Sequence, residues 1–260
     1  MASSAKTLNG VLAAILLVLF TALMVPAAWI LPPGWNFIAL MVLMILFMIT
    51  LGQRISGRPA GILINERNLM SLSRFQLILW TLIVLSAYLT IALERVHAKP
   101  TIADALGIAL DPKLWSLMGI STASLVGSSL IQSTKKDKDP KPGEVNKAAT
   151  VLGENQTAVA DNRQGLLYKN ADISDAAFSD MFEGDEVGNT AYVDLAKVQM
   201  FFFTVVAALS YGVTLFYWII TKSPSELTAF PVLSAGLIAI LGISHAGFLA
   251  NNSTAHTPTA

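Results

Sequence analysis

The residue types best suited to binding or transport recur on two apolar segments in one order: a base, a glutamine, a threonine and a tyrosine. The two sets are Arg74, Gln76, Thr81, Tyr88 and Lys197, Gln199, Thr204, Tyr211. In each set the base, the threonine and the tyrosine are seven residues apart, a step that returns to nearly the same side of a helix. Each segment is therefore predicted to carry a polar stripe, which indicates a polar path or a polar seam between helices. The alternative interpretation is that the base reaches lipid headgroups, the threonine bonds to its own helix and the tyrosine lies at the membrane interface.

His245 is the only ionisable residue well inside a predicted membrane span. Ionisable groups are costly in a bilayer and mark functional sites, so a proton or cation relay is one interpretation. The other is a neutral, hydrogen-bonded histidine that packs between helices. The predicted spans hold no Asp or Glu near their middle, which argues against proton-coupled transport.

Two further segments combine small residues with hydroxyl groups. The positions assigned to helix packing are Gly119, Ser121, Ala123, Gly127, Gly242, Ser244 and Ala246. Small residues four apart let helix backbones approach closely, which promotes association inside a membrane. We therefore interpret these segments as packing helices, with a hydroxyl-lined pore as the alternative.

The composition identifies the elements that must position these residues. Of 260 residues, 54% are hydrophobic and only 13% are charged, with a mean hydropathy of +0.60; a soluble domain carries about 25% charged residues. The apolar residues form blocks of roughly 20, enough to cross a bilayer of about 30 Å. The sequence thus predicts an all-α integral membrane protein in contact with the lipid bilayer.

Other classes are disfavoured by charge and residue content. The net charge is zero, so no nucleic-acid partner is indicated. The absence of cysteine excludes disulfides, thiolate catalysis and cysteine-ligated metals. No set of His and acidic residues can be assembled inside the bilayer, and we expect no enzyme, no metal and no cofactor.

Six spans are predicted, at about residues 10–31, 35–51, 72–93, 114–132, 198–220 and 230–250. A shift of 123 residues places Gln76 on Gln199 and also Gly119 on Gly242, so one ungapped offset serves two separate helices. We interpret this as a duplicated two-helix hairpin with parallel repeats, preceded by an extra hairpin. Ser71 and Asp194, equivalent by the offset, are predicted helix N-caps.

The predicted organisation has six parts. They are an N-terminal hairpin (1–53), a linker (54–71), the first repeat hairpin (72–132), an acidic insert (133–196), the second repeat hairpin (197–250) and a tail (251–260). Lys and Arg concentrate after the second and fourth spans, which predicts a cytoplasmic insert and cytoplasmic termini in the cell inner membrane. The first span resembles a signal peptide, but its longer apolar run predicts that it is retained.

The insert is predicted to begin with a Lys- and Pro-rich linker, "TKKDKDPKPGEVNK", and to continue as an acidic region. Residues 154–194 hold nine acids against two bases. Aromatic anchors ringed by charge suit a docking surface, which we assign to Phe178, Met181, Phe182, Glu183, Asp185 and Glu186. The function predicted from these features is a membrane anchor or scaffold subunit that forms a homo-oligomer and docks a cytoplasmic protein. The alternative is an ion channel or small transporter that uses the polar stripes.

Overall fold

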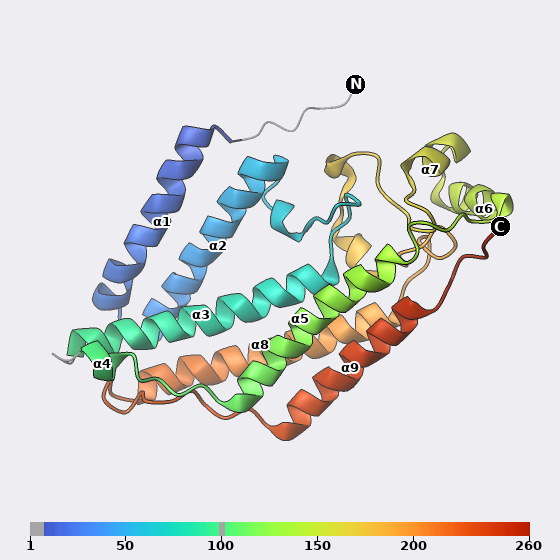
Figure 1. The fold of residues 1–260 in the computed structure, drawn as a ribbon. Helices are drawn as coiled ribbons and strands as arrows, with labels where there is room; N and C mark the ends of the chain where they lie inside the picture. The colour runs from blue at the N-terminus through green and yellow to red at the C-terminus, as the bar shows by residue number, and fades with distance from the viewer. Residues whose placement is uncertain (1–7, 99–101) are drawn as a thin grey trace. The chain divides into compact units, whose positions relative to one another are not determined.

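A computed structural model describes residues 8–98 and 102–260, and in these residues the chain is helical and has no β-strand (Figure 1). Six helices are long and apolar enough to cross a membrane. They are α1 (Gly10–Ile30), α2 (Trp35–Ser56), α3 (Leu72–Ala98), α5 (Pro112–Ser133), α8 (Leu195–Thr221) and α9 (Ala235–Ser253). The predicted all-helical class and the six membrane-length helices are confirmed; the first seven residues of the predicted 1–53 hairpin lie outside the described residues.

The shorter helices lie between the long ones. They are α4 (Ile102–Ala105), α6 (Pro142–Leu152) and α7 (Gln156–Asn162), with 3-10 turns at Gly61–Leu63, Ile173–Asp175 and Phe178–Phe182. The chain divides into two compact units. Unit 1 holds the described residues up to 62, together with 78–118 and 205–238, and unit 2 holds residues 63–77, 119–204 and 239–260.

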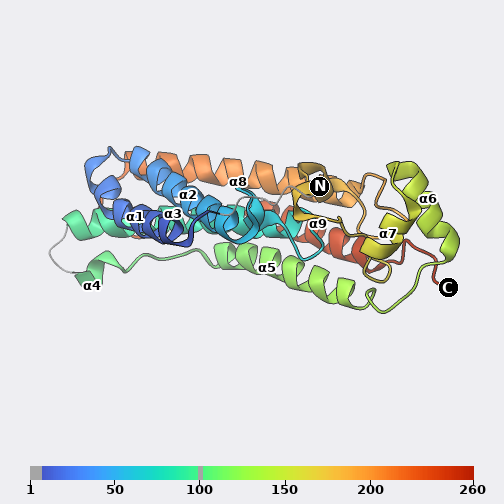
Figure 2. The ribbon, with the colours of Figure 1, turned by 90° about the horizontal axis from the view of Figure 1, so that it is seen from above.

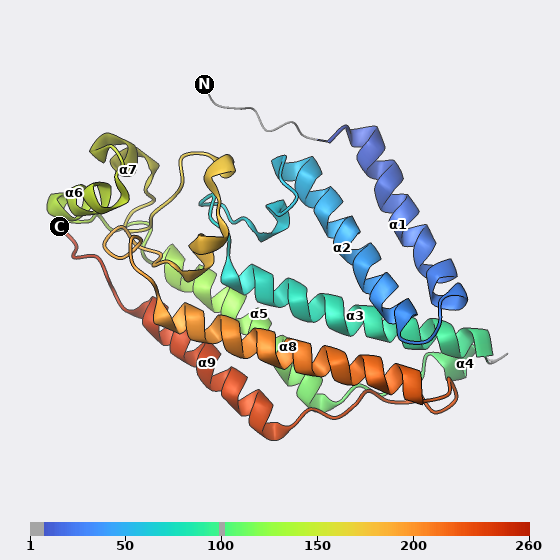
Figure 3. The same cartoon turned by 180° about the vertical axis from the view of Figure 1, so that it is seen from behind.

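In unit 1, α1 and α2 lie side by side as a hairpin (Figures 1 and 3). The turn between them passes through Gly34 at φ +84°, a conformation that favours glycine. Asn36 follows this turn and is buried, and its Nδ2 donates to Oε1 of Glu94 at 2.5 Å. The side chain thus joins the start of α2 to the far end of α3 within the same unit.

The first residues of the four membrane-length helices after α2 are related by the predicted offset of 123 residues. Helix α8 begins 123 residues after α3 (195 − 72), and each has 27 residues. Helix α9 begins 123 residues after α5 (235 − 112). The backbone N–H of Arg74 donates to Oγ of Ser71 at 3.4 Å, and that of Lys197 to Oδ1 of Asp194 at 3.3 Å. The two predicted N-caps are confirmed, whereas the duplication stays a prediction.

The insert in unit 2 is more ordered than its composition predicts. Helix α6 begins at Pro142, a residue whose fixed φ suits the first turn. Helices α6 and α7 lie side by side (Figure 2) and share an apolar cluster made by Val145, Ala148, Ala149, Val159 and Val187. The last part of the predicted Lys- and Pro-rich linker, from Pro142 onward, is helical, because the small apolar residues after Pro142 pack against α7.

A second apolar cluster in unit 2 joins the insert to helix ends. Its buried members are Leu72, Met181, Met200 and Phe248. The ring of Phe201 stacks on Phe75 at a centroid distance of 5.5 Å and meets Phe182 edge-on at 5.1 Å. Two members of this cluster, Leu72 and Phe248, also line the polar cavity of the candidate site.

Candidate functional site: a buried charged hub

Two consecutive acids, Asp185 and Glu186, lie at the centre of the polar residues of unit 2. They follow the 3-10 turn Phe178–Phe182 and are held in place by the backbone. The N–H of Tyr168 donates to the carbonyl of Asp185 at 3.0 Å, and the N–H of Glu186 to Oδ1 of Asn189 at 2.9 Å. The side chains of the two acids bind different partners.

Asp185 is shared by two cations. Its Oδ1 lies 2.5 Å from Nη2 of Arg67, and its Oδ2 lies 3.1 Å from Nζ of Lys197. Arg67 is 2% exposed, and its Nη1 also donates to the carbonyls of Tyr168 and Asp185. Burial alone would raise the pKa of the Asp185 carboxyl, but Lys197 and Arg67 together hold that pKa well below its usual range. Asp185 therefore links the loop before α3 to the first turn of α8 as a carboxylate that stays charged well below the usual pH range of an aspartate.

Glu186 binds the end of α5 and the C-terminal tail. Its Oε1 lies 2.6 Å from Nζ of Lys135, two residues beyond α5. Its Oε2 accepts the backbone N–H groups of His256 at 3.0 Å and Thr257 at 2.7 Å. Lys135 also donates to the carbonyl of Thr254 at 3.0 Å, so every charge at this place has a bonded partner.

We call Arg67, Lys135, Asp185, Glu186 and Lys197 the charged hub. Taken together, the hub links the loop before α3, the end of α5, the start of α8 and the tail after α9. A buried ion pair adds little net stability, but removal of one partner leaves an uncompensated buried charge. The hub can therefore fix the position of the insert on these helix ends.

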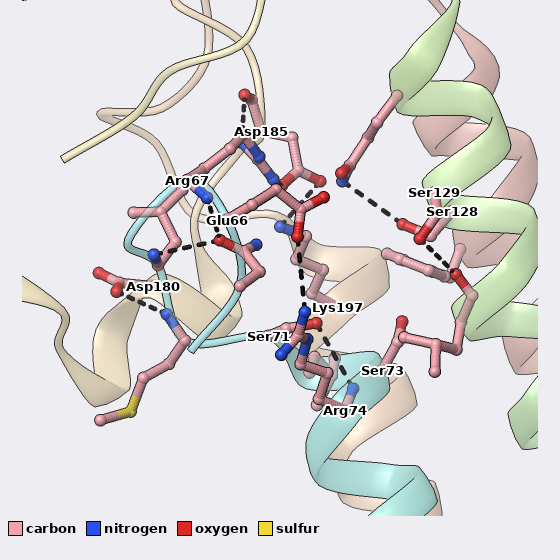
Figure 4. A pocket seen from close by; sticks show the side chains of 17 residues that line it. Glu66, Arg67, Ser71, Ser73, Arg74, Ser128, Ser129, Asp180, Asp185 and Lys197 are labelled. Atoms are coloured by element: carbon pink, nitrogen blue, oxygen red, sulfur yellow. Dashed lines mark hydrogen bonds and ion pairs between the residues drawn. The ribbon is translucent and has the colours of Figure 1, made fainter. Parts of the chain in front are cut away.

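A small polar cavity lies beside the hub (Figure 4). Its volume is about 60 Å³, and it is lined by Arg67, Asp185 and Lys197 of the hub. The lining also includes Glu66 and Asp180, Ser71, Ser73 and Arg74 at the start of α3, and Ser128, Ser129 and Gln132 near the end of α5.

The glutamines of the two predicted stripes have different environments. Gln76 is fully buried, and its Nε2 donates to Oγ1 of Thr204 at 2.7 Å. Gln199 is exposed. The structure therefore brings Gln76 and Thr204 together across two predicted stripes, and it leaves Gln199 outside this contact.

The other residues of the two predicted stripes also differ in their environments. Arg74 is half-buried and donates from Nη1 to the carbonyl of Ile64 at 2.8 Å, whereas Lys197 belongs to the hub. In unit 1, Tyr211 is buried and its hydroxyl donates to the carbonyl of Pro231 at 3.2 Å. Thr81 and Tyr88 are half-buried.

His245 is buried and bonded to a neighbouring helix. Its Nδ1 lies 2.5 Å from Oγ of Ser124, so α9 and α5 share a polar contact in unit 2. The nearby hydroxyls of Ser121 and Ser244 are buried and have no hydrogen-bond partner among the residues that the structure describes. These groups form the polar interior of the α5 and α9 segments.

The small residues of α5 and α9 make fewer contacts than the packing interpretation requires. A Cβ at Gly127 would lie 3.2 Å from Leu249, and one at Gly242 would lie 3.8 Å from Ile120. A Cβ at Gly119 would have no atom within 4 Å among the described residues. Ala123 and Ala246 are exposed. Of the three glycines assigned to helix packing, Gly127 and Gly242 therefore lie close to a neighbouring helix, and Gly119 does not.

The predicted docking surface needs correction. Met181 and Glu186 are each 1% exposed, Phe182 packs against Phe201, and the Asp185 side chain is 13% exposed and ion-paired. These residues stabilise the insert because their apolar or charged partners come from distant parts of the chain. Only Phe178, at 55% exposed, presents a large apolar surface, and Glu183 is half-buried.

Sequence reasoning missed three parts of the hub: Arg67, Lys135 and the tail around His256 and Thr257. In the sequence, Arg67 and Lys135 belong to the bases after the second and fourth spans, which indicate membrane orientation. A base beside a span usually faces lipid headgroups or solvent, so no buried ion pair is predicted for either residue. The available signal was the acidic pair Asp185 and Glu186 in the same chain, which needs cationic partners if it is buried.

The residues that the structure describes contain no group of three or more His, Asp or Glu side chains placed to hold a metal ion. Comparison with protein-family models, curated proteins and solved structures finds no match for this chain. The proposals below therefore depend on the geometry of the chain itself.

Proposed function

We infer that this chain is a membrane anchor and scaffold subunit of the cell inner membrane, with cytoplasmic termini and a cytoplasmic insert that docks a protein partner. The charged hub carries this inference. It joins the insert to the ends of α5 and α8, to the loop before α3 and to the tail. A partner bound to such an insert is held in a fixed position at the membrane surface.

The docking surface is centred on exposed apolar side chains of the insert. Phe178, Tyr192 and Val193 are 55%, 62% and 66% exposed. The backbone keeps the last two beside the acidic loop, since the N–H of Gly184 donates to the carbonyl of Tyr192 at 3.2 Å. Exposed aromatic residues next to charge favour a protein interface, with most of the binding energy in the aromatic rings.

A double variant, Phe178→Ser with Tyr192→Ser, tests the docking surface. Co-purified proteins are compared with those of the unchanged chain by quantitative mass spectrometry. The matched control is Val151→Ser on α6, where the side chain is 54% exposed and lies on the same insert. We expect one partner to be lost with the double variant and kept with the control; a partner set unchanged by both would refute the docking surface.

Membrane orientation and assembly have separate tests. Reporter fusions at Asn189 and at Ala260 are both expected to be active as cytoplasmic reporters, and a periplasmic signal at Asn189 would overturn the orientation. Mass photometry in mild detergent is expected to give a homo-oligomer, and a monomer at all concentrations would refute that part of the proposal.

An ion channel or small transporter is the second candidate. The observation in its favour is a set of buried polar atoms without partners among the described residues: Oε1 of Gln76 and the hydroxyls of Ser121 and Ser244. Such atoms suit a hydrated path, because water can satisfy them. Liposomes provide the test: flux abolished by Ser121→Ala with Ser244→Ala, but kept by Ser116→Ala at the α5 surface, would favour the channel over the scaffold.

A further inference from the structure

The geometry points to a binding site for a phosphate group in the cavity beside the charged hub, against the first turn of α3. This proposal does not depend on the scaffold function, and the residues that carry it are those labelled in Figure 4.

The size of the cavity suits a small tetrahedral oxyanion. One water molecule needs about 10–15 Å³ of this kind of space, so a cavity of about 60 Å³ holds about four to six atoms of that size. A phosphate group has five non-hydrogen atoms, whereas a nucleotide or a sugar would not enter whole.

Hydrogen-bond donors and positive charge line the cavity. Leu72 and Ser73, the first two residues of α3, line it, and the first N–H groups of a helix have no acceptor inside that helix. Arg67, which is 2% exposed, lines it together with Arg74 and Lys197. The positive end of the helix dipole favours an anion, and Arg and Lys side chains donate charge-assisted hydrogen bonds to phosphate oxygens.

The three carboxylates around the cavity are not held equally. Asp185 is occupied by Arg67 and Lys197. Asp180 accepts the backbone N–H groups of Met70 and Ala177, each at 2.9 Å. Glu66 alone is loosely held: its side chain is 60% exposed and lies 3.4 Å from Nη2 of Arg74.

Glu66 therefore occupies the position at Arg74 that a phosphate group would take. Its carboxylate is paired with Arg74 (Figure 4), so the two anions would compete for the same base. An exposed ion pair of this length contributes little to stability, so a phosphate group with several charge-assisted hydrogen bonds displaces it from Arg74. This exchange gives the site an unusual signature, because removal of an acid and removal of a base must change affinity in opposite directions.

The phosphate group has two possible sources, a free anion and the headgroup of an anionic lipid. The full chain is purified in neutral detergent, and its unfolding temperature is measured with inorganic phosphate or chloride at constant ionic strength. The same measurement is made in vesicles of phosphatidylcholine, alone or mixed with phosphatidic acid. Stabilisation by inorganic phosphate identifies a free anion as a ligand, and stabilisation only by phosphatidic acid identifies a lipid headgroup; either result supports the site.

Four single variants test whether the cavity is the place of binding. Arg74→Gln is expected to weaken the apparent phosphate affinity about tenfold, and Glu66→Gln to strengthen it about threefold or more. The matched controls are Lys138→Gln and Asp137→Asn, which make the same charge changes at exposed residues of the insert. Both controls are expected to leave the affinity unchanged.

Three results would overturn the proposal. One is an unfolding temperature that neither inorganic phosphate nor phosphatidic acid raises. Another is a loss of affinity in Lys138→Gln equal to that in Arg74→Gln, which would indicate non-specific charge attraction. The third is a weaker affinity in Glu66→Gln, which would contradict the exchange; this variant keeps the test decisive if Arg74→Gln fails to fold.

Discussion

The first turns of α3 and α8 begin alike but use their basic residues in opposite ways. Both helices are capped by the residue before them, Ser71 or Asp194. The third helical residue is then Arg74 in α3 and Lys197 in α8. Arg74 pairs with an exposed carboxylate at 3.4 Å, whereas Lys197 is buried and pairs with Asp185 at 3.1 Å.

This difference shows that one local pattern supports two roles, and that the insert decides between them. Asp185 pairs with Lys197 and with Arg67, a base from the loop before α3. Arg74 pairs instead with Glu66 and donates to the carbonyl of Ile64. The first turn of α8 is therefore structural, and the first turn of α3 is the part suited to binding.

Replacement of each base by methionine should give the largest difference between the two turns. Lys197→Met removes one of two cations from a buried carboxylate, and we expect a loss of about 3–5 kcal/mol in unfolding free energy. Arg74→Met breaks a partly exposed pair, with an expected loss of at most about 1 kcal/mol. Chemical unfolding in detergent measures both, and equal losses would show that the two bases are equivalent.

Acid should weaken the α8 connection through Asp185. The pKa of this carboxyl is held below its ordinary value, so its stabilisation is complete above the pKa of an unfolded aspartate and is lost as pH falls through the folded pKa. Unfolding temperature should therefore decrease from about pH 5 downward. Asp185→Asn should be less stable at neutral pH and should show a flatter decrease in acid, while Asp137→Asn should follow the unchanged chain.

The sequence was sufficient for the parts of the fold that depend on local chemistry. Blocks of about 20 apolar residues predict membrane-length helices because the bilayer sets their length, and Ser71 and Asp194 identify helix starts because a side-chain oxygen binds the first free N–H groups. The apolar run predicts a sixth span from residue 230, but α9 begins at Ala235, and residues 230–234 are not helical.

The hub could not be predicted because its contacts are distant in sequence. Arg67 and Asp185 are 118 residues apart, and Lys135 and Glu186 are 51 residues apart. An acid in a loop usually faces solvent, so Asp185 and Glu186 were assigned to a docking surface. Burial depends on which segments pack around a residue, and the local sequence does not contain that information.

The two glutamines give a smaller contrast between the helices. Gln76 is buried and bonded to Thr204, so Gln76→Leu leaves the threonine hydroxyl without this donor and should cost about 1–2 kcal/mol. Gln199 is exposed, and Gln199→Leu should change stability by no more than about 0.5 kcal/mol. Unfolding free energies of the two variants check this, and a larger loss at Gln199 would mean that this face is covered in an oligomer.

The caps give the smallest contrast, and they test whether the shared start of the two helices is equally important in both. Asp194 accepts the N–H groups of Ala196 at 2.9 Å and Lys197 at 3.3 Å, and its other oxygen accepts Nδ2 of Asn251 at 2.9 Å. The Ser71 hydroxyl accepts one N–H of the first turn, that of Arg74, at the longer distance of 3.4 Å.

Loss of an N-cap costs about 0.5–2 kcal/mol. We expect Asp194→Ala at the upper end of that range, because three donors lose an acceptor, and Ser71→Ala at the lower end, because its one bond is long. Asp194→Ser serves as the control, since a serine still accepts from the first turn but cannot reproduce both carboxylate oxygens; it should fall between the two. Equal losses at Ser71 and Asp194 would show that the caps, unlike the bases beside them, have kept one role in both helices.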